Sequence, residues 1–172
     1  RPILDVIVVA MGFVFRAMAG AAAVAVVVSH WLVLCTFTLC LFIALAKRRS
    51  EIAALGEGAL RTRRVHRFYS LGNLDHMLTV SATLAAMTYS LYCVDERTVT
   101  EVIGSAHLIW TIPLVVYALF RYYALTLSAG SEDPLRLVLR DAGFLAAAAA
   151  WAAAVLLALW LGDARWLAGI LA

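Results

Sequence analysis

A dense polar segment, Leu45 to Glu51, ends a long apolar run and holds the residues most able to do chemistry. Lys47, Arg48 and Glu51 are expected to continue the preceding helix. Lys47 and Glu51, four residues apart, can share one face of it. A cation next to a carboxylate on one helix is suited to bind a phosphate and to position a metal ion or a hydroxyl group. We therefore predict that Lys47 and Arg48 bind an anionic substrate, and that Glu51 is a catalytic group and a possible metal ligand.

Further basic residues follow this segment in a predicted loop, 47–73. Arg49, Arg67 and Tyr69 are candidate substrate-binding residues there. The alternative explanation is ordinary membrane topology, because Lys and Arg gather in cytoplasmic loops and are attracted to anionic lipid. The residues alone leave both explanations open.

Asp75, at the start of a later apolar run, is a second candidate catalytic residue. The structural alternative is that Asn73 caps a helix whose dipole favours a negative charge in its first turn. Arg121 and Tyr122 end another apolar run and are candidate substrate-binding residues. The alternative is that Arg121 extends to the membrane surface and that Tyr122 belongs to an interfacial aromatic belt.

Asp5 and Arg16 lie inside the first apolar run, where an unpaired charge costs free energy. They are eleven residues apart, so they project within about 20° of each other around a helix, and Gly12 and Gly20 share nearly the same stripe. One interpretation is that the stripe lines a polar cavity in which Asp5 and Arg16 contact substrate and Arg16 anchors an anion. The other is that each residue pairs with another helix and only fixes packing.

The elements that must position these residues are membrane spans. The chain has 172 residues, of which 65% are hydrophobic and 15% charged, a balance that excludes an ordinary soluble domain. A span needs about 20 apolar residues. We predict an all-α, polytopic membrane helix bundle in one domain, 1–172. Its five transmembrane helices are expected near 3–28, 30–46, 74–94, 102–127 and 139–161.

The distribution of Lys and Arg predicts the orientation. Only Arg97 and Arg165 fall on one side of the predicted spans. Eleven fall on the other: Arg1, Lys47, Arg48, Arg49, Arg61, Arg63, Arg64, Arg67, Arg121, Arg136 and Arg140. This split places loop 47–73 in the cytoplasm.

Several short motifs occur in an order that resembles a known family. They are Leu4-Asp5-Val6, Gly12 to Gly20, Ser29 to Leu32, Ala46 to Glu51, Tyr69-Ser70 with Leu74-Asp75, Tyr117 to Tyr122, Glu132-Asp133-Pro134 and Leu139-Arg140-Asp141. This ordered set is similar to the C-terminal half of the UbiA-type intramembrane prenyltransferases. Within that superfamily it most resembles the decaprenyl-phosphate phosphoribosyltransferase branch.

The resemblance implies the C-terminal half of a nine-helix fold in the cytoplasmic (inner) membrane of a bacterium. The implied reaction moves a phosphoribosyl group from phosphoribosyl pyrophosphate to a polyprenyl (decaprenyl) phosphate for cell-envelope synthesis. It requires Mg²⁺ and has no nucleic-acid partner. The main metal ligands of the family lie upstream of Arg1, so we expect a missing N-terminal half and a chain that is inactive by itself.

One departure from the family pattern bears on the reaction. Members that use prenyl diphosphates carry a second aspartate-rich motif where this chain has Lys47 to Glu51. The difference favours the phosphoribosyl branch. Two alternatives stay open: a prenyltransferase that moves an isoprenoid chain to an aromatic or lipid acceptor, and a non-enzymatic membrane subunit whose basic loop docks a partner or anionic lipid.

Overall fold

The computed structural model describes residues 3–23, 28–60, 70–103, 106–128 and 133–170, and these form helices without any strand. In chain order the helices are α1 (Leu4–Ala23), α2 (His30–Leu60), α3 (Leu71–Val94), η2 (Thr98–Ile103), η3 (Ala106–Thr111), α4 (Ile112–Ser128), α5 (Pro134–Val138) and α6 (Ala142–Ile170). Within these ranges, five helical segments are long and apolar enough to cross a membrane. The predicted all-α bundle with five spans is therefore confirmed.

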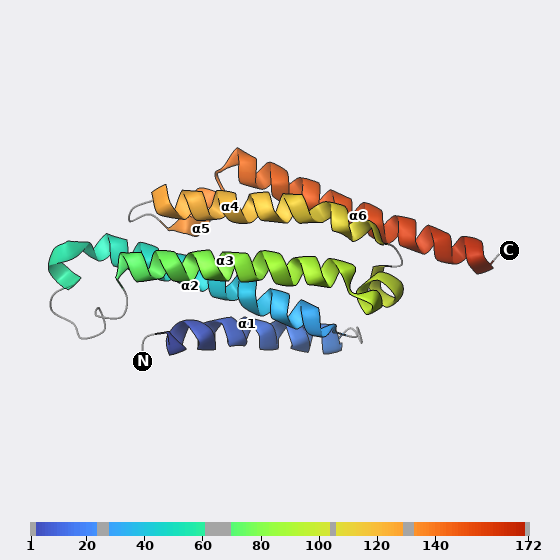
Figure 1. Cartoon of the computed structure of the whole chain (residues 1–172), viewed down its shortest axis with the longest axis horizontal. Coiled ribbons are helices and arrows are strands. Elements are labelled where there is room, and N and C mark those ends of the chain that lie inside the picture. Colours follow the sequence, from blue (N-terminus) through green and yellow to red (C-terminus); the bar gives the residue numbers. More distant parts are fainter. Residues whose placement is uncertain (1–2, 24–27, 61–69, 104–105, 129–132, 171–172) are drawn as a thin grey trace.

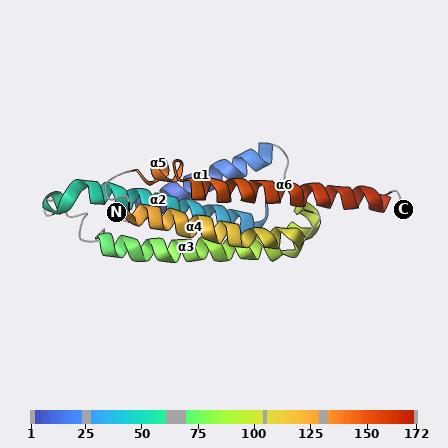
Figure 2. The ribbon, with the colours of Figure 1, turned by 90° about the horizontal axis from the view of Figure 1, so that it is seen from above.

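The long helices lie side by side in layers (Figure 1). In that view α1 lies at one edge, α2 and α3 form the middle, and α4 and α6 lie on the far side. Seen from above, α3 lies along one side of the bundle and α6 along the other (Figure 2). The core at this centre joins Phe42 and Leu45 of α2 to Leu74 and Leu78 of α3 and Leu119 of α4. Many large apolar side chains remain exposed around the bundle, as expected where helices face lipid.

The segment predicted as loop 47–73 is helical as far as Leu60, and α3 begins at Leu71 instead of 74. Residues 47–55 are Lys, Arg, Ser, Glu, Ile, Ala and Leu, mostly good helix formers without proline, so α2 continues beyond its apolar part. The prediction for Asn73 is also corrected. Ser70 is the N-cap of α3, and its hydroxyl accepts a hydrogen bond from the Asn73 N–H at 3.2 Å.

The predicted fourth span, 102–127, is not one regular α-helix. A π-helical turn, η2, and a 3₁₀-helix, η3, precede α4, which begins at Ile112. Pro113 stands in the first turn of α4, where its missing N–H costs nothing. Its ring would clash with the carbonyl group four residues earlier, so a regular helix does not extend backward through it.

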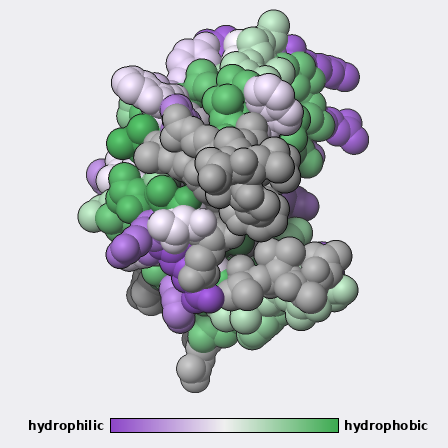
Figure 3. All heavy atoms as spheres, turned by 90° about the vertical axis from the view of Figure 1, so that its right-hand side faces the viewer, coloured by the Kyte–Doolittle hydropathy of each residue, from purple (hydrophilic) through white to green (hydrophobic). Residues whose placement is uncertain are grey.

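Hydrogen bonds between helices hold the end of the bundle that carries η2 and η3. The Tyr89 and Thr111 hydroxyl groups are 2.6 Å apart, and the Trp151 indole N–H donates to the Tyr89 oxygen at 2.7 Å. Such bonds between membrane helices contribute about 0.6–2 kcal/mol each. Seen from this end, the molecule presents both hydrophilic and hydrophobic side chains (Figure 3).

Candidate functional site

Three of the predicted site residues meet at the opposite end of the bundle. The Arg48 guanidinium donates through Nη2 to Asp5 Oδ2 at 2.9 Å and through Nη1 to Glu51 Oε2 at 2.7 Å. Between 36% and 46% of each of these side chains is exposed. We call Asp5, Lys47, Arg48 and Glu51 the α1–α2 charged cluster.

Apolar packing of α1 on α2 brings this cluster together. Val6, next to Asp5, is 2% exposed, and Leu45 and Ile52, which flank Arg48 along α2, are each 4% exposed. Glu51 reaches Arg48 because residues three apart are neighbours on a helix. The Arg48 Nε is buried and has no hydrogen-bond partner among the described residues, so its N–H is an unused donor.

Lys47 is exposed and makes no ion pair or hydrogen bond with any residue whose side chain is described. Its ammonium group therefore keeps its donors for a ligand. The cluster combines one cation that has no partner among the described residues, one arginine shared by two carboxylates, and the oxygen atoms of those carboxylates. This combination can bind a phosphate through Lys47 while Asp5 and Glu51 hold Arg48 in place.

Arg49, the next residue, points into the bundle and is not part of the cluster. Its Nε donates to Asp75 Oδ1 of α3 at 2.5 Å, and its Nη1 donates to the backbone carbonyl of Thr126 of α4 at 3.0 Å. The Arg49 side chain is 11% exposed and that of Asp75 is 34% exposed. Arg49 thus joins three helices, and we call these residues the Arg49 tie. Both Arg49 and Asp75 were predicted site residues, and here they pair with each other.

Arg121 also has a protein partner. Its Nε and Nη2 donate to the two carboxylate oxygens of Asp141 at 3.0 and 2.7 Å. Asp141 precedes α6 and accepts the backbone N–H of Phe144, so it caps that helix. The Arg121 hydrogen bonds and the Phe144 N–H lower the pKa of Asp141 to about 2. The arginine predicted to bind substrate is therefore engaged in a bidentate ion pair between α4 and the start of α6.

Close approach of α4 and α6 at this pair depends on a glycine. A Cβ atom on Gly143 would lie 3.0 Å from the Tyr117 hydroxyl oxygen and 3.3 Å from Asp141 Oδ1.

Tyr122, another predicted substrate-binding residue, is 7% exposed, and its ring packs edge-on against Phe42 at 5.2 Å between centroids. In the structure its ring is part of the core.

The remaining predicted site residues lie apart from the cluster. Arg16 is exposed on α1, about 16 Å along the helix axis from Asp5, and its guanidinium carbon lies 5.5 Å from the centre of the Phe13 ring. The stripe of Asp5 and Arg16 does not form one site in the described part of the chain. Arg67 and Tyr69 lie outside the described residues.

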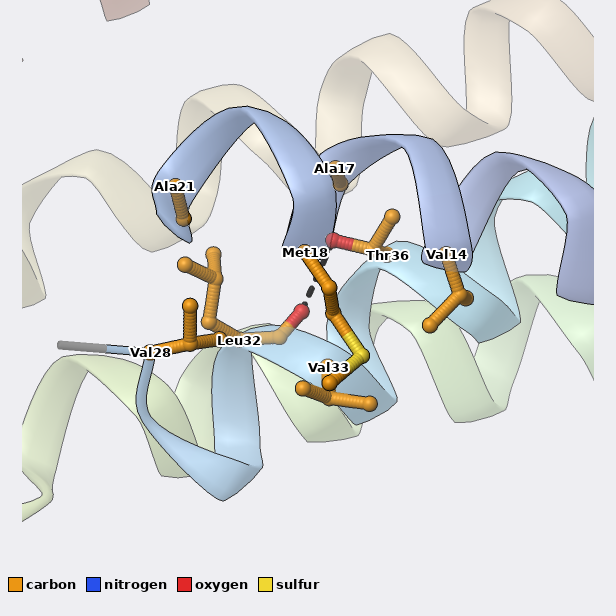
Figure 4. Close-up of a pocket in the computed structure, with 8 residues that line it drawn as sticks. All are labelled: Val14, Ala17, Met18, Ala21, Val28, Leu32, Val33 and Thr36. Atoms are coloured by element: carbon orange, nitrogen blue, oxygen red, sulfur yellow. Dashed lines mark hydrogen bonds between the residues drawn. The ribbon is translucent and has the colours of Figure 1, made fainter. Parts of the chain in front are cut away.

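An apolar cavity of about 160 Å³ lies between α1 and α2 at the end away from the charged cluster (Figure 4). It is lined by Val14, Ala17, Met18, Ala21, Val28, Leu32, Val33 and Thr36. The single hydroxyl in this lining, that of Thr36, donates to the Leu32 carbonyl at 2.8 Å. The cavity therefore suits an apolar group and not a phosphate.

The described residues contain no group of three or more His, Cys, Asp or Glu side chains placed to hold a metal ion. Asp5 and Glu51 share Arg48, and Asp75 pairs with Arg49. Glu51 is the predicted ligand that remains most accessible, with 46% of its side chain exposed. A complete magnesium site would need ligands from outside this part of the chain.

Two contacts of the site were absent from the sequence interpretation. No pattern marks the Thr126 carbonyl, because any residue supplies a backbone acceptor. Asp141 did carry a signal: an aspartate immediately before a long apolar run is a typical N-cap. That signal gives the helix start but does not identify Arg121 as the second partner.

Comparison with known proteins supports the resemblance drawn from the sequence motifs. No family model matches the chain. A curated decaprenyl-phosphate phosphoribosyltransferase of Corynebacterium glutamicum is 28% identical over 160 residues, which cover 93% of this chain and 48% of that protein. Proteins of the same name from Mycolicibacterium smegmatis and Mycobacterium tuberculosis are 26% and 27% identical, over 82% and 90% of this chain.

The chain spans about half the length of the curated relatives it matches. The resemblance predicted from the motifs is thereby confirmed: this multi-pass, all-helical chain is similar, along nearly its whole length, to decaprenyl-phosphate phosphoribosyltransferases.

Proposed function

We propose that this chain takes part in transferring a 5-phosphoribosyl group from phosphoribosyl pyrophosphate to a polyprenyl phosphate such as decaprenyl phosphate. The transfer takes place at the cytoplasmic face of a bacterial inner membrane and supplies a cell-envelope precursor. The observation that carries the proposal is the α1–α2 charged cluster, where exposed Lys47 adjoins an arginine held by two carboxylates. The similarity to transferases of that name over 93% of the chain supports it.

The reaction is a substitution at the anomeric carbon of ribose. A phosphate oxygen of the polyprenyl phosphate forms a bond to that carbon while the bond from the carbon to pyrophosphate breaks, and pyrophosphate leaves with the electron pair. Positive charge develops on the ribose and negative charge grows on the leaving group. Cations fixed near the leaving oxygens stabilise that charge.

Lys47 and Arg48 fit different parts of this task. The free, flexible ammonium of Lys47 is suited to follow phosphate oxygens as they gain charge. Arg48 is less free, because Asp5 and Glu51 occupy two of its nitrogen atoms. We propose that Lys47 contacts a phosphate of the donor directly and that Arg48 adds positive potential beside it.

Magnesium belongs to the proposal for the intact protein. The described residues do not form a complete Mg²⁺ site, so we assign no step to the ion and name only Glu51 as a possible ligand. Removing divalent cations from the intact protein should abolish transfer, and adding Mg²⁺ should restore it. Full transfer in the presence of a strong chelator would contradict this part of the proposal.

A competition assay on membranes that contain the intact protein tests the reaction. Phosphoribosyl pyrophosphate labelled in its ribose and a prenyl diphosphate labelled in its isoprenoid chain are offered together with polyprenyl phosphate and aromatic acceptors. We expect label only in polyprenyl-phosphoryl-5-phosphoribose. Prenylated acceptors would favour the prenyltransferase, and the absence of any product would favour the non-enzymatic subunit.

A further inference from the structure

Arg16 is a charged residue on a face of α1 that no described helix covers. α2 is the described helix against which α1 packs, and Val6, Ala10 and Val14 are buried there. Arg16 lies about 120° around the helix from the centre of that buried stripe. In Figure 1, α1 forms the edge of the bundle.

The guanidinium of Arg16 lies deep in the span. Its carbon is 5.5 Å from the centre of the Phe13 ring, and Phe13 stands near the middle of α1 (Leu4–Ala23). The side chain therefore turns toward the middle of the helix and not toward the nearer end, Ala23. A helix of this length just spans the hydrocarbon core, so the charge lies far from both membrane surfaces.

An arginine at that depth needs an anionic or strongly polar partner. The Arg16 guanidinium makes no hydrogen bond or ion pair with any described residue, and it lies over the ring of Phe13. A phospholipid headgroup lies at the membrane surface and does not reach the middle of a span. A carboxylate on a neighbouring transmembrane helix can reach it.

The same face is shaped for close approach of a helix. Gly12 and Gly20 lie one turn on either side of Arg16, and a Cβ atom on either glycine would meet nothing within 4 Å. Small residues at an interface let two membrane helices approach closely. The face thus combines a central charge with open backbone above and below it.

We propose that the face formed by Gly12, Phe13, Arg16 and Gly20 receives a transmembrane helix that carries an aspartate or glutamate level with Arg16. The relatives are about twice as long as the region that matches this chain. We propose that the partner helix belongs to the other half of an intact protein of that length. The proposal rests on charge complementarity and does not depend on the proposed reaction.

Replacing Arg16 by leucine tests the pairing through the sign of a stability change in the intact protein, reconstituted in lipid nanodiscs. If Arg16 pairs with a buried carboxylate, R16L leaves that carboxylate without its cation and lowers the midpoint of thermal unfolding. If Arg16 faces lipid, leucine removes an unfavourable charge and the midpoint rises. A rise or an unchanged midpoint would overturn the proposal. Arg16→Lys should lower the midpoint less than R16L.

Photo-crosslinking keeps the proposal testable if R16L fails to fold. Benzoylphenylalanine replaces either Phe13 or, as a matched control, Phe15, which is also exposed and lies about 160° away around the helix. Position 13 should crosslink to a protein segment that contains Asp or Glu, and position 15 to lipid. Lipid adducts alone from position 13 would contradict the proposal. Once the segment is mapped, exchanging its carboxylate for Arg together with Arg16→Glu should restore the midpoint.

Discussion

Arg48 and Arg49 are neighbours in the sequence but serve two different regions of the molecule. Arg48 faces α1 and solvent, and its two carboxylate partners are each at least 40% exposed. Arg49 faces α3 and α4, is 11% exposed, and binds a carboxylate and a backbone carbonyl. Successive residues on a helix point about 100° apart, which is enough to send two adjacent arginines into different environments.

The difference shows that a run of basic residues is not one binding site. The environment of each residue decides whether its charge is available to a ligand. At the α1–α2 charged cluster, Lys47 is exposed and has no partner in the described part of the chain, and Arg48 remains accessible. At the Arg49 tie, the guanidinium is already satisfied by protein groups, so its main effect should be on stability. The predictions below test this division.

Arg49→Ala should give the largest loss of stability. It leaves Asp75 without its cation and the Thr126 carbonyl without its donor, so the free energy of unfolding should fall by about 3 kcal/mol. Thermal unfolding of the intact protein in detergent or nanodiscs measures this loss. Arg49→Lys, which keeps the charge but cannot bridge both partners as well, should lose less. A loss no greater than that of Arg48→Ala would remove the distinction between the two arginines.

Lys47→Ala should affect transfer and leave stability unchanged. Losing one charge-assisted contact to phosphate costs about 1.5–3 kcal/mol, equivalent to roughly a tenfold to hundredfold slower transfer. Steady-state transfer by the intact protein gives the rate, and thermal unfolding provides the check on folding. Lys47→Arg is the matched control and should keep much of the activity. Equal rates for wild type and Lys47→Ala would exclude a substrate contact.

The pair of Asp5 and Arg48 should contribute little to stability because both side chains are more than a third exposed. A double-mutant cycle with Asp5→Asn and Arg48→Gln should give a coupling energy of about 0.2–1 kcal/mol that falls as salt is added. Chemical or thermal unfolding of the four proteins supplies the values. A larger coupling that is insensitive to salt would mean that this pair resembles the Arg49 tie.

The smallest effect is expected for pH. The contribution of the Arg121–Asp141 ion pair to the free energy of unfolding should not change with pH in the physiological range. The pKa of Asp141 is lowered from its ordinary value of 3.8 to about 2. The stabilisation is therefore complete above the ordinary value and is lost only as pH falls through about 2. The stability difference between wild type and Asp141→Asn should stay constant from about pH 8 to about pH 5. A steady decline over that range would contradict the lowered pKa.

The sequence predicted the bundle well because long apolar runs have few structural outcomes in a membrane. It also placed Lys47, Arg48 and Glu51 on a continuation of the second span, and α2 indeed includes them. The end of that helix at Leu60 and the irregular turns before α4 were missed. Hydropathy identifies apolar length, but it does not show where a polar helix continues or where backbone geometry changes.

The site was only partly predictable. Contacts between distant segments, such as that of Asp5 with Arg48, depend on how the helices pack, and no local pattern encodes them. Asp75 carried two interpretations in the sequence, helix dipole or catalysis, and the structure adds a third, the partner of Arg49. Arg121 was likewise ambiguous in the sequence, and in the structure it pairs with Asp141.

The most direct test of the division between the two regions is one measurement made on two variants. Phosphoribosyl transfer per folded molecule is measured for Arg48→Ala and for Arg49→Lys in the intact protein, with the folded fraction determined on the same samples. The account predicts that Arg48→Ala transfers at least about tenfold more slowly while remaining folded, whereas each folded Arg49→Lys molecule transfers at nearly the wild-type rate. The reverse result, with Arg48→Ala active and folded Arg49→Lys inactive, would contradict it.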